Sequence, residues 1–186
     1  MATEPHTDRR AFLGVVLAGC GGYAIYAKNR RPDVHVPARV RIASFDAQGK
    51  LLQVAEVDSV RRTDAEWRKL LPADSYSVTR RKDTELAFAG DFHNFDQPGI
   101  YSCICCGTAV FDSRDKYASG TGWPSFTAPI AKENIVKTDE ANFGPLETEV
   151  KCARCWGHLG HVFDDGPPPA GLRYCINSVA LRFRAR

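Results

Sequence analysis

The chain has no internal repeat, no glycine-rich phosphate-binding loop and no net charge over most of its length. Its formal net charge of +3 comes from residues 1–31, where five arginines and lysines face two acidic residues. Proteins that bind DNA or RNA depend on clustered positive charge to neutralise phosphates. Residues 32–186 are formally neutral, so they lack the positive charge that binding to nucleic acid needs, and we expect no nucleic-acid partner. The absence of repeats favours one ordinary domain, which we place at residues 38–186.

The first 31 residues are typical of an export signal. Arg9 and Arg10 precede an apolar run, residues 11–27, that ends at the basic segment 28–31. A twin arginine before an apolar run indicates a bacterial Tat signal. We therefore expect residues 1–31 to be a Tat-type signal peptide or a membrane or lipid anchor, followed by a linker at residues 32–37.

Three interpretations of this segment stay open. Residues 17–20 (LAGC) resemble a lipoprotein cleavage box, in which Cys20 would be the acylated first residue of the mature protein. The second is an uncleaved helix, since the 17 apolar residues lie at the short edge of the ~17–25 that span a bilayer. The third is a buried N-terminal helix. The first two predict a membrane-tethered protein that faces the periplasm or the cell exterior.

The middle of the chain predicts a hairpin, a helix and then a mostly β domain. Alternating apolar residues on either side of residues 46–50 (DAQGK) favour a β-hairpin, with a register shift before Phe45. Thr63 with Glu66 forms a capping-box pattern, so we expect a short helix that stops near Pro72. From Tyr76 onward, frequent glycine and proline predict short strands and turns.

Two C-x-x-C pairs predict a structural zinc site. Their four cysteines can bind one Zn²⁺ tetrahedrally and leave no open coordination position; they are Cys103, Cys106, Cys152 and Cys155. The 45 residues between the pairs exceed the ~15–20 of a usual zinc ribbon. Two disulfides are the competing interpretation, because an exported location permits them. Cys105 could replace Cys103 or Cys106 as a ligand, or stay free.

The remaining cysteine of the domain lies in the run from Leu172 to Phe183 (LRYCINSVALRF), which reads as one β-strand. Alternation would put Arg173, Cys175 and Asn177 on one face of that strand. A neighbouring arginine would favour the thiolate, the nucleophilic form of cysteine. The alternative is that Cys175 is only a small buried hydrophobe.

Two other segments carry candidate functional side chains. His158 and His161 are three residues apart, so a bulge at Gly160 would be needed to bring both rings to one face of a strand. No third ligand of matching spacing is present, so a purely structural pair is the alternative to a catalytic role, and a catalytic metal is not expected. Trp123 follows a glycine-rich turn, which could present its indole at the surface or bury it in the core.

The segments SGTGWPSF, GHLGHVFDDGP and RYCINS, with both C-x-x-C pairs, resemble the B-type methionine sulfoxide reductases from about Trp67 to Phe183. The resemblance implies a mostly β fold of two antiparallel sheets stapled by zinc, with a short helix before the core. It implies reduction of the R epimer of methionine sulfoxide in oxidised proteins, with a thioredoxin-like or other thiol reductant as partner.

The resemblance also implies a role for each matching side chain. Cys175 corresponds to the nucleophile, and Arg173 to the residue that favours its thiolate. Three residues correspond to groups that hydrogen-bond the sulfoxide oxygen or a nearby water: His158, His161 and Asn177. Trp123 corresponds to the indole that packs on the substrate methyl group, and we expect Phe163 to contact the substrate as well.

The sequence departs from this family at three places. Thr121 stands where many members have the cysteine that forms a disulfide with the oxidised nucleophile. Reduction by an external thiol is the interpretation we favour, with Cys105 as a weaker alternative. Trp156 follows the second pair where a small residue is common, and Leu146-Glu147 stand where many members have arginine. The alternative function is a zinc-stapled extracytoplasmic binding module that recognises a partner through the Trp123 surface without turnover.

Overall fold

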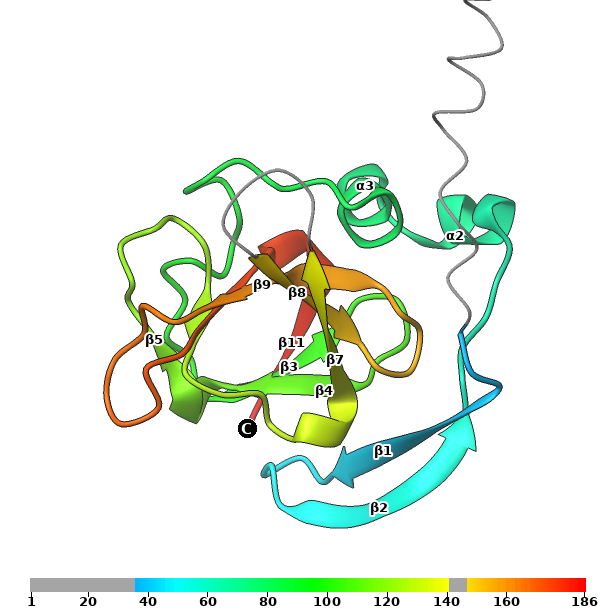
Figure 1. Ribbon diagram of the computed structural model, residues 1–186, viewed down its shortest axis with the longest axis horizontal. Helices are drawn as coiled ribbons and strands as arrows, with labels where there is room; N and C mark the ends of the chain where they lie inside the picture. Colours follow the sequence, from blue (N-terminus) through cyan, green and yellow to red (C-terminus); the bar gives the residue numbers. More distant parts are fainter. Residues whose placement is uncertain (1–35, 141–146) are drawn as a thin grey trace, which may run out of the picture. The chain divides into compact units, whose positions relative to one another are not determined.

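The computed structural model describes residues 36–140 and 147–186 (Figure 1). The signal or anchor predicted at residues 1–31, its Cys20, most of the 32–37 linker, and Leu146 lie outside this part. In the described ranges the chain is mostly β, with two α-helices. No helix in these ranges is both long enough and apolar enough to cross a membrane.

The predicted hairpin is confirmed as β1 (Arg39–Phe45) and β2 (Leu51–Asp58). The turn between them places Gly49 at φ +77°, in the left-handed region that glycine tolerates best. The expected register shift occurs between Ser44 and Phe45. Asn134 attaches this hairpin to the rest of the domain, because its buried amide bonds both the N–H and the carbonyl of Ala43.

The predicted helix is also confirmed, as α2 (Asp64–Leu70). Thr63 and Glu66 form the reciprocal capping box, and the buried Trp67 anchors the helix. A second helix, α3 (Ala73–Arg81), was not predicted, and the expectation of strands and turns from Tyr76 onward is wrong for its first residues. Its sequence, ADSYSVTRR, has weak helix propensity. Burial of four of its side chains against the core decides its structure instead.

Most strands belong to two antiparallel sheets, which confirms the predicted class, with the hairpin as a third small sheet. The larger sheet has the order β5-β6-β10-β9-β8-β7. Its strands are β5 (Lys116–Tyr117), β6 (Ser125–Phe126), β7 (Ile135–Glu140), β8 (Glu147–Cys152), β9 (His158–Phe163) and β10 (Arg173–Ile176). The smaller sheet has the order β11-β3-β4 and comprises β3 (Gly99–Cys103), β4 (Ala109–Asp112) and β11 (Leu181–Ala185).

The single strand predicted from Leu172 to Phe183 is wrong. The chain leaves the larger sheet after Ile176, turns through a 3-10 helix at Ser178–Ala180, and enters the smaller sheet as β11. β-Propensity is high throughout this run, so propensity could not reveal the break. The predicted alternation therefore holds only within β10, where Tyr174 and Ile176 are buried and Arg173 and Cys175 are half-buried.

The hydrophobic core joins the two larger sheets. Phe111 of β4 stacks on Phe126 of β6 with ring centroids 4.5 Å apart, and Tyr174 of β10 packs on Phe111 at 5.8 Å. Tyr101 of β3 contacts Phe126 at 5.1 Å. Because β10 contributes Tyr174 to this core from one face, Cys175 points to the opposite face.

Candidate active site

One row of directly paired residues crosses the larger sheet through Cys175. Cys175 pairs with Ser125 of β6 on one side and with His161 of β9 on the other. The row continues from His161 to Glu149 of β8. Directly paired residues of antiparallel strands project from the same face of a sheet. Register alone therefore gathers a thiol, a hydroxyl, an imidazole and a carboxylate on one surface.

A β-bulge adds the second imidazole to this surface. Val150 pairs with Gly160 but Lys151 pairs with His158, so Leu159 is the extra residue. The bulge predicted at Gly160 thus lies one residue earlier. It places the rings of His158 and His161 with centroids 5.2 Å apart. Gly160 allows β10 to approach, because a Cβ there would overlap the carbonyl oxygen of Cys175.

The Cys175 thiol is half-buried and borders a chain of hydroxyl groups. Its Sγ lies 4.0 Å from Thr121 Oγ1, which is 2.9 Å from Ser119 Oγ. Burial raises the pKa of the Cys175 thiol, and the charge of Arg173 and a hydrogen bond with Thr121 lower it by less. Arg173 thus acts in the predicted direction, but the pKa of Cys175 stays above its ordinary value in the free protein.

Arg173 is held by two neighbours. Its Nε and Nη2 donate to the two carboxylate oxygens of Asp165, both at 2.8 Å. Its guanidinium lies over the Phe163 ring, 4.4 Å from the centroid, and Phe163 is its direct partner across β9 and β10. This bidentate pair fixes the orientation of the guanidinium. Sequence reasoning missed Asp165, although it lies in the quoted GHLGHVFDDGP segment.

His158 is almost completely buried and is paired with Glu149. Nδ1 of His158 lies 2.8 Å from Glu149 Oε1, while Nε2 is buried without a hydrogen-bond partner. Burial opposes ionisation of Glu149, but hydrogen bonds from His158 and Lys82 and the charge of Lys151 outweigh it and lower its pKa to about 2. Sequence reasoning missed Glu149, because only the β8–β9 register brings it to the histidines.

Asn177 and Trp123 are both tied to one residue that sequence reasoning missed, Glu85. The Asn177 side chain accepts from the Glu85 N–H at 3.0 Å and donates to the Leu159 carbonyl at 3.0 Å. Trp123 Nε1 donates to the Glu85 carbonyl at 3.1 Å. The Glu85 carboxylate accepts from the N–H groups of Ser178 and Val179. The Asn177 carbonyl oxygen and one of its amide hydrogens are therefore already bonded to the backbone, which leaves one amide hydrogen for another partner.

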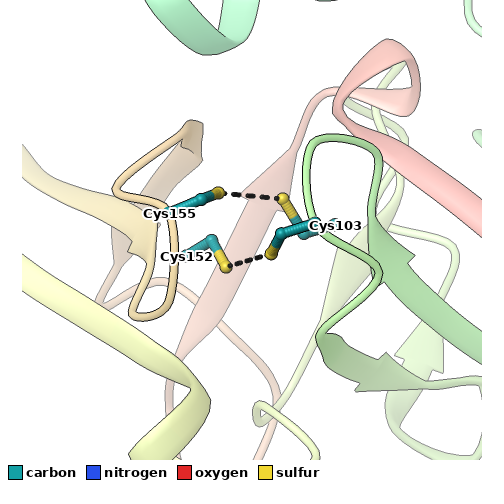
Figure 2. Close-up of side chains that lie close together, drawn as sticks. Cys103, Cys152 and Cys155 are labelled. Carbon is teal, nitrogen blue, oxygen red and sulfur yellow. Dashed lines mark hydrogen bonds between the residues drawn. The ribbon is translucent and has the colours of Figure 1, made fainter. Parts of the chain in front are cut away.

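The four predicted zinc ligands converge. Their sulfurs all lie within 4.8 Å of one another. Figure 2 shows Cys152 and Cys155 on one loop facing Cys103 on another. The sulfurs of Cys103 and Cys155 are 3.6 Å apart, and those of Cys106 and Cys152 are 3.5 Å apart. Tetrahedral Zn–S bonds of about 2.3 Å place ligand sulfurs roughly 3.8 Å apart. A disulfide needs about 2.05 Å, so the geometry fits a metal and disagrees with the disulfide alternative.

This cluster connects the two larger sheets. The first pair begins at the last residue of β3 in the smaller sheet, and the second begins at the last residue of β8 in the larger one. Hydrogen bonds from Cys103 and its neighbours hold the pKa of Cys106 well below its usual range. The same network raises the pKa of Cys103 and Cys155, so the fit to a divalent cation rests on the convergence of four soft sulfur ligands.

A family model described as the SelR domain matches residues 71–185. The chain belongs to the SelR-domain family of B-type methionine sulfoxide reductases. A protein named peptide methionine sulfoxide reductase MsrB from Hahella chejuensis is 48% identical over 129 residues, which cover 69% of this chain and 93% of that protein. One of the same name from Pseudomonas putida strain F1 is 50% identical over 127 residues, covering 68% and 97%.

A plant relative shows the same domain in a longer chain. Peptide methionine sulfoxide reductase B1, chloroplastic, from Oryza sativa subsp. japonica is 52% identical over 126 residues, which cover 68% of this chain and 59% of that protein. The family match begins at residue 71, so the β1–β2 hairpin and α2 lie before it. The relatives' matches of 127–129 residues are longer than this range and reach back into the α2 region. Asn134 ties the hairpin to the rest of the domain through Ala43.

Trp156, one of the departures from the family, and Cys105 each have specific local contacts. Trp156 occupies a left-handed position, φ +59°, that a residue with a Cβ adopts at some cost. Its ring packs under the Lys151 ammonium, 5.3 Å from the centroid. The Cys105 sulfur is not one of the group of four, but it hydrogen-bonds Cys103 and Cys155 and contacts Thr79 Oγ1 of α3 at 3.3 Å.

Proposed function

We propose that the protein reduces methionine-(R)-sulfoxide in oxidised proteins to methionine, with Cys175 as the nucleophile. The observation that carries this proposal is the pairing of Cys175 with His161 across β9 and β10, on the sheet face that also holds His158. A sulfoxide needs a nucleophile at sulfur and a proton donor at oxygen. This face offers a half-buried thiol and two imidazoles for those tasks.

The first half-reaction transfers one oxygen atom. The Cys175 sulfur forms a bond to the sulfoxide sulfur, while a proton reaches the sulfoxide oxygen. The oxygen then moves to Cys175, which becomes a sulfenic acid, and methionine leaves with its sulfur reduced. Because burial raises the pKa of Cys175, loss of the thiol proton and protonation of the oxygen occur together in this scheme. Arg173 stabilises the developing thiolate.

The substrate contacts follow from the resemblance and the surrounding side chains. Trp123, held by Glu85, supplies an apolar surface for the substrate methyl group, and Phe163 lies beside Arg173 on the polar side. His158 and His161 hydrogen-bond the sulfoxide oxygen. Asn177 adds its remaining amide hydrogen to this polar side of the site. An apolar surface opposite a polar one distinguishes the two epimers of the sulfoxide.

The second half-reaction uses an external reductant. Two thiols of a thioredoxin-like or other partner convert the sulfenic acid to a thiol, releasing water and a disulfide. Thr121 lies next to Cys175 but has no sulfur to oxidise. Cys105 contacts Thr79 of α3 beside the metal cluster, which favours the external route over an internal Cys105–Cys175 disulfide.

A structural Zn²⁺ completes the protein in this proposal. Cys103, Cys106, Cys152 and Cys155 would hold it, and it would supply no chemistry to the reaction because protein sulfurs fill every position. When bound, it would fix the β8–β9 connection that leads into β9, whose first residue is His158.

The remaining part of the proposal concerns location. We propose that residues 1–31 direct export by the Tat route and tether the domain, residues 38–186, to the outer side of the membrane, through a lipid on Cys20 or an uncleaved helix. Tat transport carries folded proteins, so zinc would load before export. Fractionation of cells expressing the full chain should recover it with membranes; recovery in the soluble cytoplasm would refute this location.

The enzymatic part is tested by one variant. Wild-type protein with dithiothreitol should reduce a methionine-(R)-sulfoxide substrate and leave the S epimer unchanged. Cys175→Ser should lose the activity while zinc content and thermal unfolding stay unchanged. Full activity in Cys175→Ser would refute the mechanism. A wild type without activity on either epimer would favour the binding module without turnover.

A further inference from the structure

Glu149 is a buried carboxylate with a specific set of partners. Its side chain is 5% exposed, and Oε1 accepts from His158 Nδ1 at 2.8 Å. Oε2 lies 3.0 Å from Lys82 Nζ and 3.2 Å from Lys151 Nζ. A buried carboxylate is costly unless it is paired. Two ammonium groups on one oxygen leave the other oxygen for the imidazole.

The pairing determines which nitrogen of His158 carries a proton. An ionised carboxylate can only accept hydrogen bonds, so the Nδ1 atom that faces it must be the donor. In the neutral ring, Nε2 is then the lone-pair nitrogen, and in the charged ring it is a second donor. Nε2 is also the ring atom left buried without a partner. Buried polar atoms are rarely left unpaired unless a ligand or water completes them.

The two lysines come from different elements, which makes the arrangement specific. Lys151 is two residues from Glu149 on β8, so both side chains share one face. Lys82 ends α3 with φ +64°, a left-handed position that glycine or asparagine usually occupies. A lysine at this strained position places its ammonium on Glu149. α3 therefore helps to keep the carboxylate ionised.

We propose that Glu149 is a positioning residue: it holds the His158 ring with Nδ1 protonated and Nε2 directed to the sulfoxide oxygen. Lys82 and Lys151 keep Glu149 in the acceptor form that this task needs. The inference rests on the proposed function for its substrate, but the state of the ring is independent of turnover. The same division of labour, a carboxylate that fixes the tautomer of a histidine, operates in serine proteases.

The variant that tests this is Glu149→Gln. The amide keeps the size of the side chain but can also donate, so the other tautomer of His158 becomes possible. The kcat for methionine-(R)-sulfoxide should fall by about tenfold or more, because a misplaced proton removes most of a general acid's contribution. The KM should change by less than about threefold, because Glu149 lies behind His158 rather than against the substrate.

A double-mutant cycle with His158→Ala separates positioning from a structural role. If Glu149 acts through His158, Glu149→Gln should cost less than about twofold in kcat in the His158→Ala background. Asp112→Asn is the matched control, because Asp112 is an equally buried carboxylate paired with Arg114 and Arg186 in the smaller sheet. It should lower the thermal unfolding midpoint and leave kcat unchanged. An undiminished loss in the His158→Ala background would overturn the proposal.

Nitrogen NMR of the labelled full chain gives a readout without turnover. The wild type should show His158 with Nδ1 protonated, and Glu149→Gln should show the Nε2-protonated form or a mixture. A wild-type ring without a proton on Nδ1 would refute the positioning role, whatever the kinetics. An inactive wild type whose ring has the expected proton would refute the proposed function alone.

Discussion

The hydroxyl of Thr121 lies 4.0 Å from the sulfur of Cys175. By the resemblance of SGTGWPSF to the family, Thr121 stands where many members carry a second cysteine, so a hydroxyl lies here beside the Cys175 thiol. Ser119 bonds both Thr121 and Ser125, so the thiol faces hydroxyl groups on this side. In the proposed mechanism, recycling of oxidised Cys175 therefore depends on a thiol from elsewhere.

Thr121→Cys should restore an internal disulfide. After one turnover without reductant, the variant should lose two hydrogens and cross-link residues 121 and 175, because the side chains already touch. The wild type should instead gain one oxygen on Cys175. Mass spectrometry of intact and digested protein measures both states, and Thr121→Ser is the matched control. A Cys105–Cys175 disulfide in the oxidised wild type would contradict the external route.

The ionisation of Cys175 should respond to two neighbours with opposite signs. The charge of Arg173 lowers the pKa of the thiol and that of Asp165 raises it. Arg173→Ala should therefore move the midpoint of the pH-dependent alkylation rate upward, and Asp165→Asn should move it downward. In the wild type the midpoint should lie above the ~8.5 of a free thiol.

The measurement is the rate of iodoacetamide labelling of Cys175 from pH 6 to 11, read for each cysteine separately by mass spectrometry of digested protein, because Cys105 and Cys20 lie outside the four proposed zinc ligands. The thiol form predominates below the midpoint, so labelling accelerates as pH rises through it. Because burial raises the pKa of Cys175, this acceleration should occur at a higher pH than for a free thiol. Midpoint shifts of the same sign in the two variants would refute the electrostatic account.

Removal of one zinc ligand should release the metal and destabilise the domain. Cys152→Ser should lose zinc and lower the free energy of unfolding by more than about 4 kcal/mol, because the cluster joins both larger sheets. Cys105→Ser is the control and should keep both, since Cys105 lies outside the group of four. Metal analysis measures the zinc content of each variant, and chemical denaturation measures its free energy of unfolding. A metal-free wild type with two disulfides would contradict the zinc assignment.

Asn134 should matter for the attachment of the hairpin and not for the chemistry. Its amide makes three bonds, to the N–H and carbonyl of Ala43 and to the carbonyl of Ala109, and it is completely buried. Asn134→Ala leaves these groups unpaired and should cost about 3 kcal/mol. Asn94→Ala, at an exposed position, should cost less than about 0.5 kcal/mol. The kcat should stay unchanged in both.

Short-range patterns were sufficient for several parts of this protein. The capping box at Thr63, the glycine turn at Gly49 and the two C-x-x-C pairs each depend on residues within one turn of each other. Such patterns have a local physical cause, so the helix α2, the hairpin and the two cysteine pairs could be predicted. Convergence of the pairs was expected because together they fill the four positions of one Zn²⁺. The motif around Cys175 pointed to the family for the same reason.

Long-range contacts decided what the sequence analysis missed. The helix α3 forms because the core buries Tyr76 and Val78, although its propensity is weak. The strand predicted across Leu172–Phe183 divides between two sheets, because Ile176 and Leu181 pair with different strands. The local pattern of apolar residues predicts neither the helix α3 nor the division of the strand.

The sequence by itself predicted the candidate nucleophile, the four candidate metal ligands and the two histidines, since each belongs to a compact motif whose chemistry depends on residue type and spacing. Only the tertiary structure decided that Glu149 pairs with His158, that Glu85 holds Trp123 and Asn177, and that the pKa of Cys175 lies above its ordinary value. These depend on strand register, on a one-residue bulge at Leu159 and on burial, which arise when segments far apart in the chain pack together.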